Sequence, residues 1–420
     1  MMLSADLLDE VQRIGALVPG ALRCSWEFLK ASEDVRAFVF RSPKSEGAHF
    51  DPGHGYPLGE GPLFRLDLLL EQDGAKVVPW LVDINLMAGM AGVTGGIHRV
   101  YADYADHVWG SGALTGSFDL DGWATGIADR LHGSPADGTT VDYVIRAGHA
   151  LVPDAQGVVS ALQRAGFSAR LTPLDELKFT DGKLTTGAGA EVSHVFRQVR
   201  AVTKHGGDAA VRRRETQAFE SLTDAWRSGA IRMDPGFHMY LESHAWMHFW
   251  HDHVFAQTFR STHGRGDYSF LMSRIPRTMR VYDEELVAPG RFTTRRRQPG
   301  DVDGAVLKRA DSTGGAGLKM TGWPASAEEK AALEAELSAS HHDGLLLQDR
   351  VRQSRYTFPF ADPGQEPSLV AGPLKLAAYF RGGTCLGAHA LLTPDDHESL
   401  RPGSALRLLP LFVPVFRSHR

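Results

Sequence analysis

The sequence contains little cysteine, no long apolar segment and no excess of basic residues. Two cysteines, Cys24 and Cys385, are too few for a cysteine-based zinc site or a disulfide framework, which is typical of a reducing cytoplasm. No stretch approaches the roughly 18 uncharged apolar residues of a membrane-spanning helix, and acidic residues near the N-terminus do not fit a signal peptide. The formal net charge of -5 argues against nucleic acid as the main ligand. We therefore predict a cytoplasmic protein that binds neither membranes nor nucleic acids.

Two familiar site signatures are also missing. No GxGxxG opens a helix after a strand, which disfavours a Rossmann dinucleotide site. No HExxH is present to mark a zinc protease. The composition itself is ordinary for a globular protein, with 43% hydrophobic and 23% charged residues over 420 positions. This length predicts two or three domains with sizeable cores.

Helix and strand patterns follow one another along the chain. Residues 4–19 have the spacing of an amphipathic helix capped by Ser4. Residues 64–70 and 77–85 indicate two strands joined through Asp73-Gly74, a strong hairpin signal. A strand, a helix and a strand at 141–145, 155–165 and 168–171 indicate a parallel sheet. Further helices are predicted at 98–108, 123–131, 209–229 and 326–338, and further strands at 194–199, 345–351, 374–381 and 384–392.

An acidic residue and an amide stand two apart at the end of the second hairpin strand. Asp83 and Asn85 would project from one face of that strand, and Asp67 would lie on the neighbouring strand. Carboxylate and amide oxygens suit Mg²⁺, which is commonly held together with nucleotide phosphates. The alternative is that Asp83 and Asn85 simply begin the next turn. The segment 87–96 is rich in small residues, as a loop approached by a ligand would be.

A second glycine-rich segment follows a strand that ends in lysine. Residues 306–318 are Val-Leu-Lys-Arg-Ala-Asp-Ser-Thr-Gly-Gly-Ala-Gly-Leu. Such a loop can turn several backbone N–H groups toward one anion, and Lys308 adds a positive charge. We interpret the segment as a phosphate-binding loop. The alternative is an ordinary glycine-rich hairpin turn.

Histidines and arginines cluster in two further places. Residues 241–259 contain four histidines among aromatic residues, His244, His248, His251 and His253. Their helical spacing raises the hypothesis of a zinc site, but a packed aromatic helix with incidental histidines is favoured. The run 212–214 consists of three arginines on the predicted polar helix 209–229, which is typical of a solvated helix face.

Taken in order, these motifs resemble the circularly permuted branch of the ATP-grasp family, which includes glutathionylspermidine synthetases and related amide ligases. In that family a lysine and a glycine-rich loop cover the phosphates, and a later strand supplies an adenine hinge. The resemblance assigns these roles to Lys308, to Ser312, Thr313, Gly314, Gly315 and Gly317, and to Leu347, Gln348 and Asp349. The acid-x-Asn signature comes before this lobe, at Asp83 and Asn85, which is the permuted order.

The resemblance also implies the domain organisation. The expected fold is a mixed α+β and α/β ATP-grasp fold in circularly permuted order, with an inserted βαβ domain built on a parallel sheet. Residues 1–135 would form the N-terminal part of the core with the Mg²⁺ motif, and 136–205 the βαβ domain. Residues 206–300 would be a helical connecting region, 301–350 a small lobe with the glycine-rich loop, and 351–420 C-terminal strands that return to the core.

The activity implied by the resemblance is an ATP-dependent ligation of a carboxylate to an amine through an acylphosphate, with release of ADP and phosphate. It assigns Mg²⁺ to Asp67, Asp83 and Asn85. Four more basic residues are implied at the carboxylate or the γ-phosphate, Arg65, Arg197, Lys375 and Arg381, with a surface ion pair as the alternative for each. The expected partners are a small carboxylate, such as an amino acid or peptide, and an amine. The two alternatives are a non-catalytic ATP-grasp-like nucleotide-binding protein and a zinc hydrolase that uses the His244–His253 segment.

Overall fold

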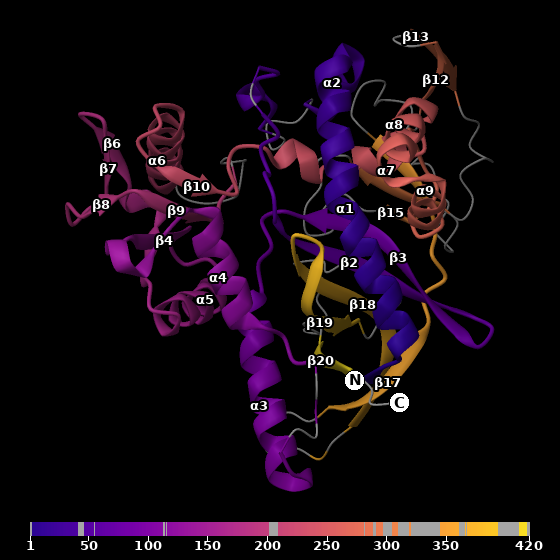
Figure 1. Cartoon of the computed structure of the whole chain (residues 1–420), viewed down its shortest axis with the longest axis horizontal. Coiled ribbons are helices and arrows are strands. Elements are labelled where there is room, and N and C mark those ends of the chain that lie inside the picture. Colours follow the sequence, from indigo (N-terminus) through magenta and orange to yellow (C-terminus); the bar gives the residue numbers. More distant parts are fainter. Residues whose placement is uncertain are drawn as a thin grey trace.

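The computed structural model describes residues 2–40, 46–53, 55–111, 114, 116–200, 209–280, 282–288, 291–296, 305–309, 319–320, 345–360, 366, 368–393 and 411–417. A large sheet with helix α1 (Ala5–Ala31) across one face lies beside a second unit of strands and helices, as Figure 1 shows. Within the described residues, none of the helices combines the length and the apolar character needed to cross a membrane.

The large sheet joins the two ends of the chain. Its order is β1-β20-β19-β18-β2-β3, with β17 also paired to β18. These strands are β1 (Met2–Leu3), β2 (Leu63–Asp73), β3 (Lys76–Asn85), β17 (Arg355–Phe360), β18 (Ser368–Arg381), β19 (Thr384–Leu392) and β20 (Leu411–Arg417). The predicted hairpin is present, because β2 pairs antiparallel with β3, and the strands predicted at 374–381 and 384–392 also pair antiparallel, as β18 and β19. β18 also pairs with β2, which places a C-terminal strand beside the N-terminal hairpin.

Helix α1 buries its apolar face against this sheet. Ser4 caps it as predicted, with its hydroxyl accepting the N–H of Leu7. The prediction ended the helix at residue 19, yet it continues through Pro19 to Ala31. An interior proline costs about 3 kcal/mol, but Leu22, Trp26 and Leu29 beyond it are fully buried, each worth roughly 1.5–3 kcal/mol. Burial therefore outweighs the proline. A short helix, α2 (Glu33–Val39), follows.

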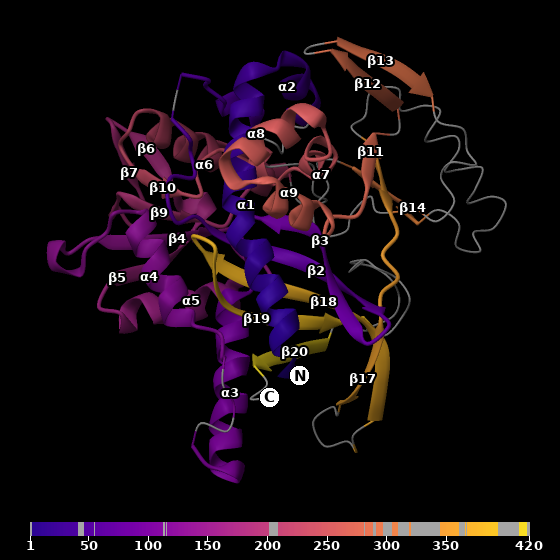
Figure 2. The same ribbon diagram turned by 45° about the vertical axis from the view of Figure 1, so that its right-hand side comes forward.

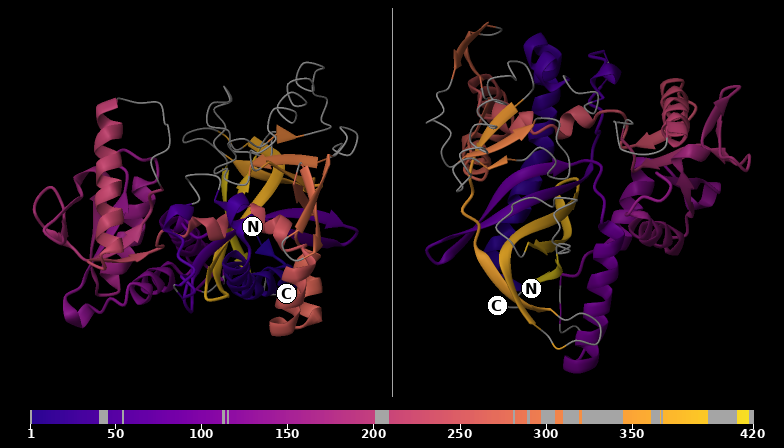
Figure 3. Two further views of the ribbon diagram at one scale, coloured as in Figure 1. Left: turned by 90° about the horizontal axis from the view of Figure 1, so that it is seen from above. Right: turned by 180° about the vertical axis from the view of Figure 1, so that it is seen from behind.

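The second unit contains a parallel sheet in the order β10-β9-β4-β5. Strands β4 (Thr140–Ile145) and β5 (Ser168–Pro173) pair in parallel through helix α5 (Val152–Arg164), so the predicted βαβ connection is confirmed. β9 (His194–Arg197) and β10 (Arg232–Asp234) extend this sheet. Around it lie α4 (Leu120–Arg130), α6 (Ala209–Arg227) and a small sheet of β6 (Lys178–Thr180), β7 (Lys183–Thr185) and β8 (Glu191–Val192). Figure 3 shows this unit beside the large sheet.

The region predicted as a helical connection, 206–300, is only partly helical. Its helices are α6, α7 (Ala245–Phe249), α8 (His253–His263) and α9 (Arg265–Met272), preceded by the 3₁₀ turn η5 (Met239–Glu242). It also contributes β10 to the parallel sheet, β11 (Thr278–Arg280) to a third sheet, and the hairpin β12 (Tyr282–Ala288) with β13 (Arg291–Arg296). The single aromatic helix expected at 241–259 is interrupted, because Asp252 caps α8 by accepting the N–H of Val254.

A third sheet has the order β11-β16-β14-β15 and carries the predicted lysine strand. Strand β14 (Ala305–Arg309) pairs antiparallel with β16 (Leu345–Asp349) and with β15 (Lys319–Met320). The glycine-rich loop that follows Lys308, including Ser312, Thr313, Gly314, Gly315 and Gly317, and the helix predicted at 326–338 lie outside the described residues. The division of the chain into five segments stays a prediction.

The small-residue segment 87–96 is not a loop throughout. Helix α3 (Ala91–Trp109) begins inside it, because the buried carboxylate of Asp154 accepts the N–H groups of Met90 and Val93. Gly92 packs against α5 so closely that a Cβ there would lie 2.0 Å from the carbonyl oxygen of Asp154. The small residues therefore allow two helices to approach and leave the start of α3 occupied by a carboxylate of the protein itself.

We expect Gly92→Ala to destabilise the protein by about 1–3 kcal/mol, because the added methyl group would overlap the backbone of α5. Gly96→Ala is the matched control on the same helix. A Cβ at Gly96 meets nothing within 4 Å, so alanine should stabilise the helix by up to about 1 kcal/mol. Urea unfolding of both variants measures the difference, and equal midpoints would contradict the tight packing.

Candidate functional site

Polar side chains gather on one face of the β2–β3 hairpin. Asp67 lies directly opposite Asp83, and Arg65 lies opposite Asn85. A β-bulge at Val82 shifts the register, so Leu81 pairs with Leu68 on the core face while Asp83 remains on the polar face. In a regular strand Leu81 and Asp83 would share a face. The bulge thus allows an apolar strand to present a carboxylate beside that of Asp67.

Asp67 is held by two cations from two strands. Nε of Arg65 donates to one carboxylate oxygen at 2.8 Å, and Nζ of Lys375, on β18, donates to the other at 2.7 Å. Burial on its own would raise the pKa of Asp67, but the attraction of Arg65 and Lys375 outweighs it, so this pKa lies well below its ordinary value. Asp67 is therefore ionised at neutral pH with both oxygens engaged.

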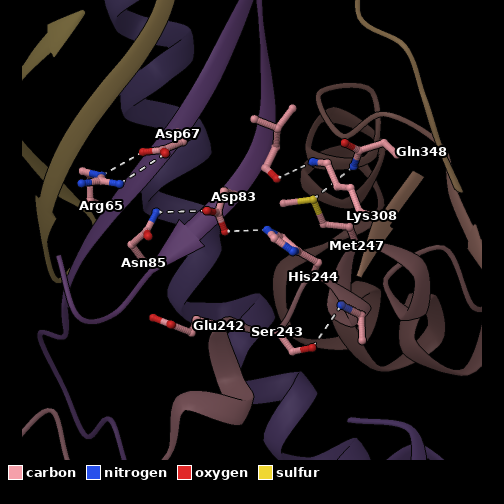
Figure 4. A network of polar contacts seen from close by, with 12 residues as sticks. Arg65, Asp67, Asp83, Asn85, Glu242, Ser243, His244, Met247, Lys308 and Gln348 are labelled. Atoms are coloured by element: carbon pink, nitrogen blue, oxygen red, sulfur yellow. Dashed lines mark hydrogen bonds and ion pairs between the residues drawn. The ribbon is translucent and has the colours of Figure 1, made fainter. Parts of the chain in front are cut away.

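Asp83 has different partners, shown in Figure 4. Nε2 of His244 lies 3.1 Å from one oxygen, and the amide nitrogen of Asn85 lies 3.5 Å from the other. Burial favours the protonated acid, but His244 and, more weakly, Lys308 lower the pKa of Asp83. From the sequence, His244 is predicted to be an incidental histidine of a packed aromatic helix or, less favoured, a zinc ligand, and no local pattern connects it with a strand some 160 residues earlier.

Lys308 and Gln348 approach this face from the third sheet (Figure 4). In that sheet Lys308 lies opposite Leu346 and Val306 opposite Gln348, so the lysine and the glutamine share a face. Nζ of Lys308 donates to the carbonyl of Val82 at 3.3 Å, and the side chain is almost fully buried. The amide of Gln348 donates to the hydroxyl of Thr278 at 3.0 Å.

The predicted hinge residues occupy different positions on β16. Leu347 and Gln348 are buried, whereas Asp349 is exposed and its N–H donates to the carbonyl of Arg277. The backbone of β16 pairs with β14 on one side and with β11 on the other. The carbonyls and N–H groups of these residues therefore belong to the small sheet that carries Lys308.

The backbone after β3 is anchored by side chains that belong to no recognisable sequence motif. One oxygen of Glu242 accepts the N–H of Leu86 at 2.8 Å, and the other pairs with Arg200. The carbonyl of Gly89 accepts hydrogen bonds from the hydroxyl of Tyr379 at 2.9 Å and from Arg65 at 3.2 Å. These contacts fix the end of β3, and with it Asn85.

Arg197 and Arg381 lie apart from this cluster. All five N–H groups of Arg197 are used inside the protein, by the carboxylate of the buried Glu46 and by the carbonyls of Pro235, Gly236 and Val199. Arg381 lies opposite Leu63 and pairs with Asp129 on α4. Neither side chain contacts Asp67 or Asp83 among the described contacts. The surface-pair alternative describes Arg381, whereas Arg197 forms a buried structural pair.

The four histidines of the aromatic segment do not converge. His244 faces Asp83, His248 lies 3.3 Å from the carbonyl of Thr278, and His253 is exposed. Within the described residues, no group of three histidine, cysteine, aspartate or glutamate side chains is placed to hold a metal ion. Both cysteines are free thiols, and burial raises the pKa of Cys24 to about 11.

Buried histidines make the fold sensitive to mild acid. Burial, the largest cause in each case, lowers the pKa of His238 and His248 to about 3 and that of His49 and His98 to about 4. The unfolded chain binds these protons near pH 6.5, so their contribution to stability is complete above that pH and declines as the pH falls. Each of these histidines is expected to lower the free energy of unfolding by up to about 1.4 kcal/mol for each unit by which the pH falls.

We therefore expect the melting temperature to fall steeply between about pH 6.5 and pH 4.5, before most carboxylates titrate. Calorimetry across this range measures the slope. His238→Gln should reduce it, because a buried imidazole that resists protonation is removed, whereas His253→Gln at an exposed position should not. A flat melting temperature from pH 7 to pH 5 would contradict this expectation.

Comparisons with known proteins bear on the fold. No protein-family model matches the sequence, and no curated protein matches it. A solved structure, a glutathione synthetase-like effector from Globodera pallida in its apo form, superposes with a TM-score of 0.60 at 12% identity, over 99% of this chain and 88% of that one. The chain has a glutathione synthetase-like fold. This confirms the mixed α+β class, while the permuted order stays a prediction.

A second structure is more distant. It is a protein from Methylobacillus flagellatus proposed to be a gamma-glutamylcysteine synthetase. The match has 11% sequence identity and covers 95% of this chain and 87% of that protein. Its TM-score of 0.42 is too low to support an argument about this fold.

Within the part of the chain that the structure describes, this cluster brings cations and carboxylates close together. Arg65, Lys308 and Lys375 contribute three positive charges, and Asp67 and Asp83 two negative ones. Buried like charges repel strongly unless a counter-charge is present. A site lined by these cations and carboxylates suits an anionic ligand such as a polyphosphate, either alone or with a divalent cation.

Proposed function

We propose that this protein is an ATP-dependent ligase that joins a carboxylate to an amine and releases ADP and phosphate. The observation that carries the proposal is the approach of β14 to β3. Nζ of Lys308 reaches the carbonyl of Val82, next to Asp83, although the two residues are 226 positions apart. The two motifs, phosphate-binding lysine and acid-x-Asn pair, are thereby brought to one place, which supports a split ATP site.

The proposed nucleotide would be held by two groups of residues, one at its phosphates and one at its adenine. Lys308 would pair with the phosphates, together with Ser312, Thr313, Gly314, Gly315 and Gly317 of the following loop. Leu347, Gln348 and Asp349 of β16 remain the proposed adenine hinge, although their backbone already pairs with β14 and β11. Phosphoryl transfer depends mostly on positioning and charge neutralisation, and a buried lysine provides both where water is excluded.

The residues present fit a magnesium ion. Asp83 and Asn85 offer a carboxylate and an amide on one face, with Asp67 opposite, which is the hard oxygen set that Mg²⁺ prefers. Asp67, Asp83 and Asn85 would hold the ion, which when bound neutralises phosphate charge. Asp67 already gives both oxygens to Arg65 and Lys375, so Asp83 and Asn85 are the more accessible donors.

Arg65 and Lys375 would bind the substrate carboxylate. Both lie beside Asp67 and contribute more positive charge than it neutralises. In the proposed reaction the substrate carboxylate accepts the γ-phosphoryl group from ATP, and the amine then displaces phosphate from the resulting acylphosphate. A desolvated arginine and lysine would stabilise the negative charge that moves between these groups.

The test is a screen for ADP release. Purified protein with Mg·ATP is incubated with amino acids or peptides singly and in pairs with amines, and products are measured by mass. We expect a particular pair to stimulate ADP release and to yield an amide whose mass equals the sum of both substrates minus water. Formation of AMP in place of ADP would overturn the acylphosphate mechanism, and chelation of Mg²⁺ should abolish turnover.

A second candidate is a nucleotide-binding protein without ligase activity. The saturation of Asp67 by Arg65 and Lys375 favours it, because a committed carboxylate is a poorer metal ligand. Calorimetric titration with Mg·ATP separates the two. Binding without ADP release across the whole substrate panel would support the second candidate.

A further inference from the structure

Helix α3 carries an exposed apolar surface. Seven large hydrophobic side chains are exposed in the described part of the chain, and five of them lie in the last ten residues of this helix, Val100, Tyr101, Tyr104, Val108 and Trp109. Tyr104 is 61% exposed and Trp109 is 68% exposed. Scattered exposed hydrophobics are normal, but a contiguous patch marks an interaction site.

The two halves of α3 differ in their surroundings. The first half is fixed to β19, because His98 lies 2.9 Å from the carbonyl of Ala388 and the hydroxyl of Thr94 lies 2.8 Å from His389. In the second half only Ala105 is buried. Figures 1 and 2 show this half projecting beyond the sheets at the lower edge. A helix segment of this length is marginal in water without packing, so its apolar residues call for a partner.

Four of these exposed residues, together with the half-buried Ile97, form a continuous stripe, whereas Trp109 lies on another arc of the helix. Ile97, Tyr101, Tyr104 and Val108 are spaced by four, three and four residues, which is the seam of a two-helix coiled coil. With Val100 they occupy an arc of roughly 100° on the helix surface. Charged residues, Arg99, Asp103 and Asp106, lie on a different arc, and the residues buried on the protein's own body lie on a third. The stripe is therefore apolar, unlike a typical solvent-exposed helix face, and none of the described residues covers it.

We propose that this stripe, residues 97–108 of α3, is the interface with a second copy of the same chain. The arc contains no charged side chain that would select a different partner, and an isologous dimer requires only a self-complementary surface. In an antiparallel pair of helices the seam places Tyr101 across from Tyr104 of the second copy, and Ile97 across from Val108. Each of these two contacts then joins side chains of comparable size.

The area is sufficient for a weak to moderate dimer. Aromatic side chains bury about 150–250 Å² each when fully covered, so complete cover of the exposed parts of Ile97, Val100, Tyr101, Tyr104 and Val108 would bury at most roughly 500 Å² per chain. Two copies would bury about 1,000 Å², the lower limit for a specific interface. Association is independent of the proposed ligase activity, because α3 meets the site only through its buried first half.

The mass in solution tests this proposal. Light scattering after gel filtration should give twice 45.8 kDa for the wild-type chain. Tyr101→Glu with Tyr104→Glu should give the mass of one chain, because four carboxylates would face one another in the seam. Arg99→Glu, on the charged arc of the same helix, is the matched control and should remain dimeric. Far-UV circular dichroism verifies folding, and Tyr104→Ser, a milder change, should weaken association at least about tenfold if the double variant does not fold.

Three results would overturn the proposal. The first is a wild-type chain that stays at the mass of one copy up to roughly 100 µM, where a dimer with a dissociation constant in the micromolar range would be populated. The second is a double variant that remains dimeric, and the third is an Arg99→Glu control that dissociates as well. The first would assign the stripe to another protein or to the chain itself, and the other two would place the dimer interface elsewhere.

Discussion

Replacing Lys308 with alanine is expected to lower ATP-dependent ADP release by at least about 100-fold, the effect of removing one donor that stabilises charge in a transition state. The reason is its position: Lys308 is buried beside Asp83, and its ammonium group lies 3.3 Å from the carbonyl of Val82. A neutral methyl group leaves the phosphates without this charge. Steady-state ADP release with the substrate pair found in the screen measures the effect.

Two controls separate the chemistry from folding. Lys183→Ala removes an exposed lysine on β7 that pairs with Glu191 on the neighbouring strand β8, and it should leave turnover unchanged. Lys308→Met keeps most of the buried apolar stem, so it should lose activity to the same degree as alanine while unfolding at a higher temperature than alanine does. Wild-type turnover in a folded Lys308→Ala variant would remove Lys308 from the site and, with it, the main support for the proposed function.

Arg197→Met is expected to destabilise the protein by about 3–5 kcal/mol, the cost of leaving a buried charge without its partner. The carboxylate of Glu46, 4% exposed as a residue, receives two hydrogen bonds from this guanidinium, at 2.5 and 2.9 Å. Three backbone carbonyls lose their donor as well. Denaturant unfolding should show a large fall in the midpoint, large enough in a marginally stable protein to abolish folding.

The pairing explanation is tested by a second substitution. In Arg197→Met with Glu46→Gln, the uncompensated charge is removed, so the double variant should recover part of the loss. Arg164→Met is the control, because Arg164 pairs with Asp121 at the surface and should cost no more than about 1 kcal/mol. Equal destabilisation by Arg197→Met and Arg164→Met would contradict a structural role for Arg197 and return it to the list of substrate-binding candidates.

Local patterns predicted most elements of the fold. The alternation of leucines around Asp67, the Asp73-Gly74 turn and the capping by Ser4 each depend on neighbouring residues, so they could be recognised without knowing the tertiary structure. The same holds for the strand, helix and strand at 140–173. The errors came from long-range packing. Burial carries α1 through Pro19, and Asp154 starts α3 inside a segment that resembles a flexible loop.

The candidate site was only partly predictable, for a related reason. Asp67, Asp83, Asn85 and Lys308 were proposed from motifs, and the structure places them together. His244, Glu242 and Tyr379 belong to no motif, because their contacts with the hairpin join residues more than 150 positions apart. Arg197 shows the opposite limit, because an arginine in a strand has the same local pattern whether it faces a ligand or a buried glutamate.

The sequence by itself determined the β2–β3 hairpin, the side of a strand on which Asp83 and Asn85 project, and the presence of a lysine strand before a glycine-rich segment. Those features depend on local propensity and on the two-residue period of a strand. Only the tertiary structure decided which charges meet. The bulge at Val82, the pairing of β18 with β2 and the approach of β14 bring Arg65, Lys375 and Lys308 around two carboxylates. Electrostatic interaction depends on distance in space, and sequence separation does not reveal that distance.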